Sequence, residues 1–193
     1  YEIYQCDWSS DVCSSDLGTP VSRVLVADAS KRSEKVNAYV SGVGPTRRVV
    51  LYDTLLEKAD ADEIALVVAH ELGHRRARHV AKGTALGAAA AALVTLAVWL
   101  VVADPGDPQS APSVMLVGTV LELLALPLQT ALSRRWEREA DRASLDLTGA
   151  PEVYRATHTR LAETNLADLD PPRWLYRLLF SHPTPPEIGR PHV

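Results

Sequence analysis

The sequence predicts an α+β fold that is mostly helical, with a small β-sheet, one metal-binding helix and a transmembrane helical hairpin. Three observations predict it. Short apolar segments separated by turn residues lie before residue 53, and long helical patterns follow. The pentapeptide His70-Glu71-Leu72-Gly73-His74 lies inside the first long helical pattern. Two apolar segments, 83–103 and 113–132, have the length of membrane spans.

Residues 1–17 are expected to lie outside the fold. Residues 7–17 can be back-translated into a string that resembles a sequencing-library adapter, and residues 1–3 fit the preceding part of such an adapter. We therefore interpret residues 1–17 as a translated adapter artefact, fused to a domain fragment at 18–193 whose own N-terminus is missing. Both cysteines, Cys6 and Cys13, lie in this segment, so they say nothing about the redox compartment.

The small sheet and the metal-binding helix follow in order. Strands are expected at 21–27, 37–40 and 49–52, and a short helix at 54–58. Asp60, with Glu63 three residues later, forms a capping-box pattern that predicts the start of a helix over 61–82. Residues 64–69 are continuously apolar, so this helix is expected to pack deeply, which a metal site needs.

Two candidate membrane spans follow that helix. Residues 83–103 carry no charge, and a helix of that length, at ~1.5 Å per residue, crosses a ~30 Å hydrocarbon core. The second candidate, 113–132, contains Glu122 and Pro127, which are costly in lipid unless they face protein or water. A turn-rich acidic loop joins the two into a predicted hairpin. The alternative is an Ala-rich helical hairpin in the core of a soluble protein.

Charged residues beside the spans predict their orientation. Basic residues precede the first span and follow the second, namely Arg75, Arg76, Arg78, Lys82, Arg134, Arg135 and Arg138, whereas the loop between the spans holds only acids. The positive-inside rule then predicts a multi-pass protein of the cell membrane whose active site faces the cytoplasm, with the lipid bilayer as a partner. The net charge of −4 gives no basic footprint for nucleic acid.

The pentapeptide carries the predicted chemistry. Residues i and i+4 share one face of a helix, so His70 and His74 can bind the same metal ion. Glu71 lies close enough to hold a water bound to that metal. Two histidines, a third ligand and one open position make a catalytic zinc site. The alternative is a charged helix face with two unrelated histidines.

The third ligand has to come from another part of the chain. A longer motif with a glycine at position 77 and a histidine at position 80 is excluded, because this chain has Ala77 and Val80. His79 lies about 140° from the ligand face and is interpreted as a residue next to the ligands or on the surface, not as a ligand.

A later helical segment supplies carboxylates. Glu137 and Asp141 are four residues apart, so Glu137 can bind the metal while Asp141 accepts a hydrogen bond from the far nitrogen of a ligand histidine. Glu139 points elsewhere and is the weaker candidate. The alternative is a solvated helix with paired arginines and glutamates. His158 and His192 fit no motif and are interpreted as surface residues.

These features together resemble the type 1 CAAX prenyl endopeptidases, a family of integral-membrane zinc metalloproteases of the gluzincin class. The heat-shock membrane protease HtpX is a more distant relative. The matching segments occur in family order and cover most of residues 20–185: 30–32, 37–39, 47–55, 62–63, 70–74 with His79, 133–137 and 140–141.

The resemblance implies a gluzincin fold, one zinc ion and a set of roles. The ligands would be His70, His74 and Glu137, and Glu71 would be the general base. The strand at Asn37-Ala38-Tyr39 would be an edge strand that binds a peptide substrate as an added strand.

A C-terminal segment, Ser181-His182-Pro183, also resembles the family. By that match His182 donates a hydrogen bond to the oxyanion of the tetrahedral intermediate. The alternative is a loop histidine beside prolines. The expected function is therefore a zinc-dependent membrane endopeptidase that cleaves a peptide or protein substrate with a zinc-activated water. The alternatives are a membrane zinc-binding scaffold without turnover and a soluble zinc protease.

Overall fold

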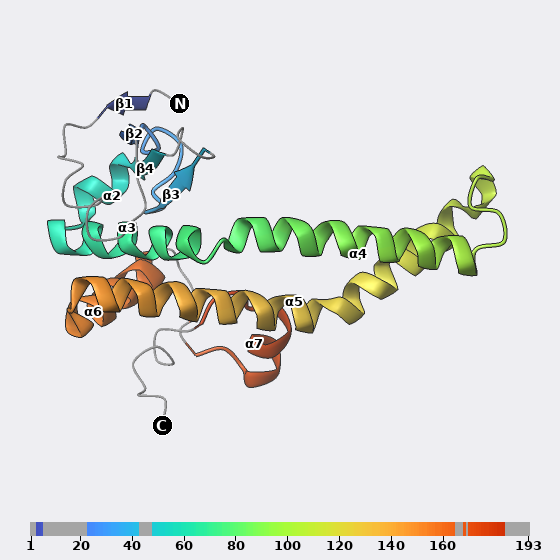
Figure 1. Ribbon diagram of the computed structural model, residues 1–193. Coiled ribbons are helices and arrows are strands. Elements are labelled where there is room, and N and C mark those ends of the chain that lie inside the picture. Colours follow the sequence, from blue (N-terminus) through green and yellow to red (C-terminus); the bar gives the residue numbers. More distant parts are fainter. Residues whose placement is uncertain (1–2, 6–22, 43–47, 165–167, 169, 184–193) are drawn as a thin grey trace. The chain divides into compact units, whose positions relative to one another are not determined.

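Figure 1 shows the computed structural model, which describes residues 3–5, 23–42, 48–164, 168 and 170–183. The strands are β1 (Ile3–Gln5), β2 (Arg23–Ala27), β3 (Ala38–Ser41) and β4 (Arg48–Tyr52). The helices are α2 (Asp53–Lys58), α3 (Ala61–Arg76), α4 (His79–Val101), the short 3-10 helix η2 (Pro108–Ser110), α5 (Ala111–Thr148), α6 (Pro151–Thr164) and α7 (Arg173–Leu179). The described chain is mostly helical, as expected.

The described residues form two compact units. The first unit contains those up to Ala77, those from Trp136 to Pro171, and Pro183. The second unit contains Arg78–Arg135 and Pro172–His182. Helix α5 therefore contributes its first part to the second unit and its last part to the first unit.

The sheet of the first unit has the strand order β1-β2-β4-β3. Strands β2 and β4 are parallel, and β3 lies antiparallel to β4 at one edge. The three predicted strands are thus confirmed within one or two residues. The sequence prediction leaves residues 1–17 out of the fold, whereas the structure pairs β1 antiparallel with β2. Most of that segment, residues 6–17, lies outside the described part of the chain.

Helix α3 lies on one face of this sheet and builds the core. Its N-terminus carries the predicted capping box: Asp60 Oδ1 accepts from the Glu63 amide at 3.0 Å, and Glu63 Oε2 accepts from the Asp60 amide at 2.9 Å. The side chains of Leu66 and Leu72 are fully buried. The core also contains Val24, Val36, Ala38, Val49, Leu51, Leu55, Ile64 and Val68. The apolar run before the motif is therefore deeply packed, as predicted.

The helix that carries the His70–His74 pentapeptide ends earlier than the sequence predicts. Helix α3 stops at Arg76 instead of residue 82, and α4 starts at His79. Arg78, between the two helices, has a left-handed backbone with φ of 58°. Such a conformation breaks a right-handed helix, yet no glycine or proline marks the position in the sequence. The prediction of one helix over 61–82 is wrong for that reason.

The second unit contains two long apolar helices, as predicted: all of α4 and the first part of α5. Helix α4 and the helical region Pro108–Thr148 that contains α5 are long and apolar enough to cross a membrane by length and composition, and their most apolar windows are not buried in the structure. This exposure gives no support to the soluble-core alternative. Helix α5 is continuous through Pro127, so the predicted span and the predicted carboxylate segment belong to one helix of 38 residues.

The end of α7 is held by two side chains of α5. Arg134 is buried, and its guanidinium donates to the carbonyl oxygens of Tyr176 at 3.2 Å and Phe180 at 2.5 Å. Thr130 Oγ1 donates to the carbonyl oxygen of Arg177 at 3.1 Å. The last carbonyls of a helix have no partner inside the helix, so these donors fix the end of α7 directly before residues 181–183.

Candidate metal centre

A glycine lets α5 approach α3 closely. A Cβ atom added at Gly73 would lie 3.0 Å from Ala140 Cα and 3.1 Å from Ala140 O. One helical turn away, the buried hydroxyl of Ser144 donates to the carbonyl oxygen of Leu66 at 3.1 Å. The backbones of the two helices therefore nearly touch. This approach brings the carboxylates of α5 to the histidines of α3.

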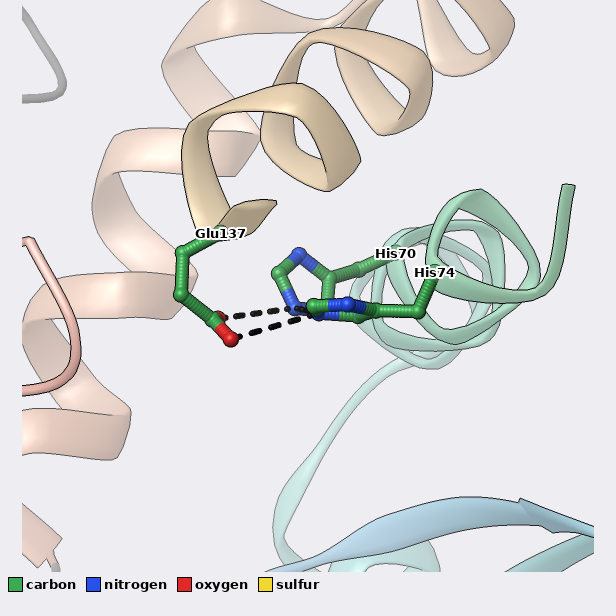
Figure 2. Close-up of side chains that lie close together, drawn as sticks. All are labelled: His70, His74 and Glu137. Carbon is green, nitrogen blue, oxygen red and sulfur yellow. Dashed lines mark hydrogen bonds and ion pairs between the residues drawn. The ribbon is translucent and has the colours of Figure 1, made fainter. Parts of the chain in front are cut away.

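Three side chains converge between the helices, as Figure 2 shows. The Nε2 atoms of His70 and His74 are 3.1 Å apart. Glu137 Oε2 lies 3.5 Å from His70 Nε2, and Glu137 Oε1 lies 3.4 Å from His74 Nε2. Two ring nitrogens and one carboxylate thus meet around a single point, and this group could hold a metal ion.

Asp141 lies on the opposite side of the His70 ring. Its Oδ1 atom is 3.0 Å from His70 Nδ1, and the Asp141 side chain is buried. Because a carboxylate accepts, Nδ1 carries a proton, and Nε2 is the nitrogen that faces Glu137 and His74. Burial alone would lower the pKa of His70, but its hydrogen bonds to Asp141 and Glu137 outweigh burial and raise that pKa to about 10.

Two residues of α6, Tyr154 and His158, also lie at the site, although the sequence did not indicate them. The ring of Tyr154 stacks on that of His158, with centroids 4.0 Å apart. His158 Nε2 lies 3.8 Å from Asp141 Oδ1, so the interpretation of His158 as a surface residue is wrong. Burial lowers the pKa of His158, with a partly opposing effect from Asp141. The only sequence signal is the i, i+4 spacing of the two rings.

Glu71 follows His70 on α3 and is partly buried. The residues expected to bind substrate lie beside this helix, because α3 packs against the edge strand β3. Ala38 is buried, whereas Tyr39 is exposed on the strand and meets Tyr52 edge to face. Arg75, the residue after His74, donates to the carbonyl oxygen of Gly42 just beyond β3.

Two of the remaining histidines are described in the second unit. His182 is exposed, with its Nδ1 atom 2.9 Å from Ser181 Oγ, and its role at the oxyanion stays a prediction. His79 is buried at the start of α4. His192 lies outside the described residues.

The chain matches proteins of known family. The sequence model of Peptidase family M48 matches residues 9–187, a range that begins within the segment interpreted as adapter-derived. The chain is 31% identical over 188 residues to the uncharacterized metalloprotease YhfN of Bacillus subtilis, which covers 89% of this chain and 43% of that protein. It is 29% identical to the CAAX prenyl protease 1 homolog of Oryza sativa, over 88% of this chain and 43% of that protein.

Two further matches agree. A Protease HtpX homolog of Acidiphilium cryptum is 35% identical over 79% of this chain and 54% of that protein. The crystal structure of S. mikatae Ste24p superposes with a TM-score of 0.84 at 24% identity, over 97% of this chain and 51% of that chain. The expected fold is therefore confirmed, and the chain spans about half the length of these relatives.

Proposed function

The chain belongs to peptidase family M48, and from this membership we propose that it carries the zinc centre of a membrane endopeptidase. The observation that carries the proposal is the convergence of His70, His74 and Glu137 between α3 and α5. One zinc ion per chain would be held by these three side chains. Peptides or proteins would be the substrates.

The donor set fits zinc in its chemistry and its spacing. Zinc prefers nitrogen and oxygen donors at about 2.0–2.1 Å in a tetrahedron, which separates neighbouring donors by about 3.3 Å. The three separations here are 3.1, 3.4 and 3.5 Å. A catalytic zinc site uses three protein ligands and leaves one position open, which agrees with a set of two histidines and one glutamate.

Glu71 is the proposed general base. Zinc bound in such a site would polarise the scissile carbonyl and acidify a water. Glu71 would accept a proton from the attacking water as the new C–O bond forms, and would deliver that proton to the amine nitrogen as the C–N bond breaks. His182 is the proposed donor to the oxyanion of the tetrahedral intermediate, by its match to the Ser-His-Pro segment of the family.

The edge strand β3 is the proposed binding place for the substrate backbone. Tyr52 donates to the carbonyl oxygen of Asn37, so residues 37, 39 and 41 face β4, and the backbone groups of Ala38 and Val40 point away from the sheet. Asn37 Oδ1 accepts from the Ala38 amide at 2.9 Å, on that outward side. An extended peptide would therefore pair with the Ala38 carbonyl and with Val40.

Helices α4 and α5 are proposed to cross the membrane, with the metal centre on the cytoplasmic side. Their apolar surfaces support the first part, and the basic residues next to the spans support the second. Several relatives are named as CAAX prenyl proteases, so a prenylated peptide is one substrate to test.

Cleavage of casein or a quenched peptide in mild detergent tests the function. We expect zinc-dependent cleavage that a chelator abolishes and added zinc restores. Glu71→Gln should keep its zinc and lose activity by about 100-fold or more, the size of a general-base contribution. Equal cleavage by Glu71→Gln and the unchanged protein would contradict the proposal.

A further inference from the structure

We infer that Tyr154 and His158 of α6 are positioning residues for the metal centre: they hold the Asp141 carboxylate, which in turn orients His70. The inference rests on the proposed function, since it takes His70 as a zinc ligand. It concerns two residues that belong to no motif, and it adds α6 to the two helices, α3 and α5, that form the site.

The hydroxyl of Tyr154 and the Oδ2 atom of Asp141 are natural partners. Tyr154 is only 1% exposed, and Asp141 is 5% exposed. Both atoms are buried, and neither makes a hydrogen bond to any group among the described residues. A buried tyrosine hydroxyl almost always finds a hydrogen-bond partner. Burial raises the pKa of Tyr154, and the neighbouring Asp141 carboxylate raises it further, so the hydroxyl stays protonated and can donate.

His158 fixes the position of the Tyr154 ring. Its Nδ1 atom lies 3.0 Å from the carbonyl oxygen of Tyr154, one turn back along α6. A carbonyl can only accept, so Nδ1 carries the proton. The His158 ring then lies flat against the Tyr154 ring, at an interplanar angle of 29°. At 3.8 Å its Nε2 atom is too far from Asp141 for a direct hydrogen bond, so His158 acts through the stacked ring.

Two contacts would together define the plane of the Asp141 carboxylate. A carboxylate that meets His70 only through Oδ1 can still rotate about its side-chain bond. A hydrogen bond from the Tyr154 hydroxyl to Oδ2 would prevent that rotation and fix the direction of the His70 Nδ1–H bond. The Nε2 atom of His70 is then aimed at the point shared with His74 and Glu137. Partners of this kind, one step outside the ligands, typically change metal affinity 10- to 100-fold.

Helix α6 is itself tied to the helix that carries His70. Arg160 forms an ion pair with Glu63 at the start of α3, and Thr157 Oγ1 lies 3.5 Å from Glu63 Oε1. Glu63 also closes the capping box of α3. These contacts therefore fix the position of Tyr154 and His158 relative to α3.

Zinc affinity, measured by competition with a chelator of known affinity, tests the inference. Tyr154→Phe removes only the hydroxyl and should raise the zinc Kd about 10-fold or more. Tyr52→Phe, on the sheet, is the matched control and should leave the Kd unchanged. A merely structural role would lower the melting temperature of the metal-free protein and leave the Kd as it was, which would overturn the inference.

A second pair of variants keeps the test independent of the Tyr154 substitution. His158→Ala removes the stacked ring and should raise the Kd, whereas His158→Phe restores a stacked ring and should restore the affinity. Failure of His158→Phe to restore the affinity would show that the stacked ring is not what His158 contributes, and would overturn its positioning role. A wild-type protein that binds no zinc would refute the proposed function itself, which is a separate outcome.

Discussion

Asp141 Oδ1 lies 3.0 Å from His70 Nδ1, at ion-pair distance, on the side of the ring opposite to Glu137 and His74. This single contact assigns the two ring nitrogens different roles. The nitrogen that faces the Asp141 carboxylate carries the proton, and the other nitrogen faces the point where three donor atoms meet. A metal ion held by His70, His74 and Glu137 would therefore depend on a carboxylate outside that set of three.

Removing the charge of Asp141 should weaken zinc binding. Asp141→Asn can place an amide N–H group against His70 and so favours the wrong protonation of the ring. We expect the zinc Kd to rise about 10- to 100-fold, measured by chelator competition. Asp146→Asn, an exposed change on the same helix, should bind zinc like the unchanged protein. Equal affinities for the two variants would show that the Asp141 contact has no role in binding.

Zinc binding should release a proton from His70 and tighten as the pH rises. In the metal-free protein burial lowers the pKa of His70, but Asp141 and Glu137 raise it to about 10, so Nε2 is protonated at pH 7–9. A proton on Nε2 competes with the metal. Calorimetry in buffers of different ionisation enthalpy should count about one proton released per zinc from this residue. Binding that neither releases protons nor changes with pH would contradict the raised pKa.

The same shift affects the stability of the metal-free protein with a definite sign. The folded-state pKa of His70 lies above its ordinary value of 6.5, so its contribution to stability is complete below pH 6.5. That contribution is lost as the pH rises towards about 10. Unfolding of the metal-free protein in denaturant, followed from pH 6 to 10, should show this loss, and His70→Gln should remove it.

A side chain at Gly73 should separate α3 from α5. Ala is the better helix former, yet its Cβ would lie 3.0 Å from the backbone Cα of Ala140, tighter than nine in ten Cβ contacts in proteins. We expect Gly73→Ala to destabilise the protein by about 1–3 kcal/mol, the usual cost of overpacking, and to weaken zinc binding. Gly87→Ala on α4 meets open space and should be neutral or slightly stabilising. Thermal unfolding of both variants in detergent compares them, and equal stability would argue against the close helix approach.

Loss of Arg134 should loosen α7. Its guanidinium donates to carbonyl oxygens of Tyr176 and Phe180, and it lies over the Tyr176 ring at 4.9 Å. Arg134→Ala should lower the unfolding free energy by about 2 kcal/mol or more, because hydrogen bonds to a charged group contribute about 1.5–3 kcal/mol. Arg135→Ala, its exposed neighbour, should change stability by about 0.5 kcal/mol or less. Similar melting temperatures for the two variants would contradict a stabilising role for the hydrogen bonds from Arg134 to α7.

Local patterns in the sequence were enough to predict much of the fold and most of the arrangement at the site. The capping box of Asp60 and Glu63 places the start of α3 correctly, because capping is a contact between near neighbours. The i, i+4 spacings of His70 with His74 and of Glu137 with Asp141 indicate shared helix faces, and the structure brings these two faces together.

The features that the sequence did not predict depend on distant contacts or on backbone conformation. Arg78 adopts a left-handed conformation that its residue type does not announce, so the end of α3 was misplaced by six residues. Tyr154 and His158 have no known spacing to the pentapeptide, and only the packing of α6 on α3 brings them to Asp141. A lone histidine between polar residues gives no signal of burial.

Zinc content after dialysis, measured on Glu137→Gln and Glu139→Gln side by side, tests the central claim most directly. Both variants change one carboxylate of α5 to an amide, but only Glu137 lies within 3.5 Å of both histidines. We predict that Glu139→Gln keeps one zinc per chain and that Glu137→Gln loses it. Retention of one tightly bound zinc by Glu137→Gln would contradict a centre built from His70, His74 and Glu137.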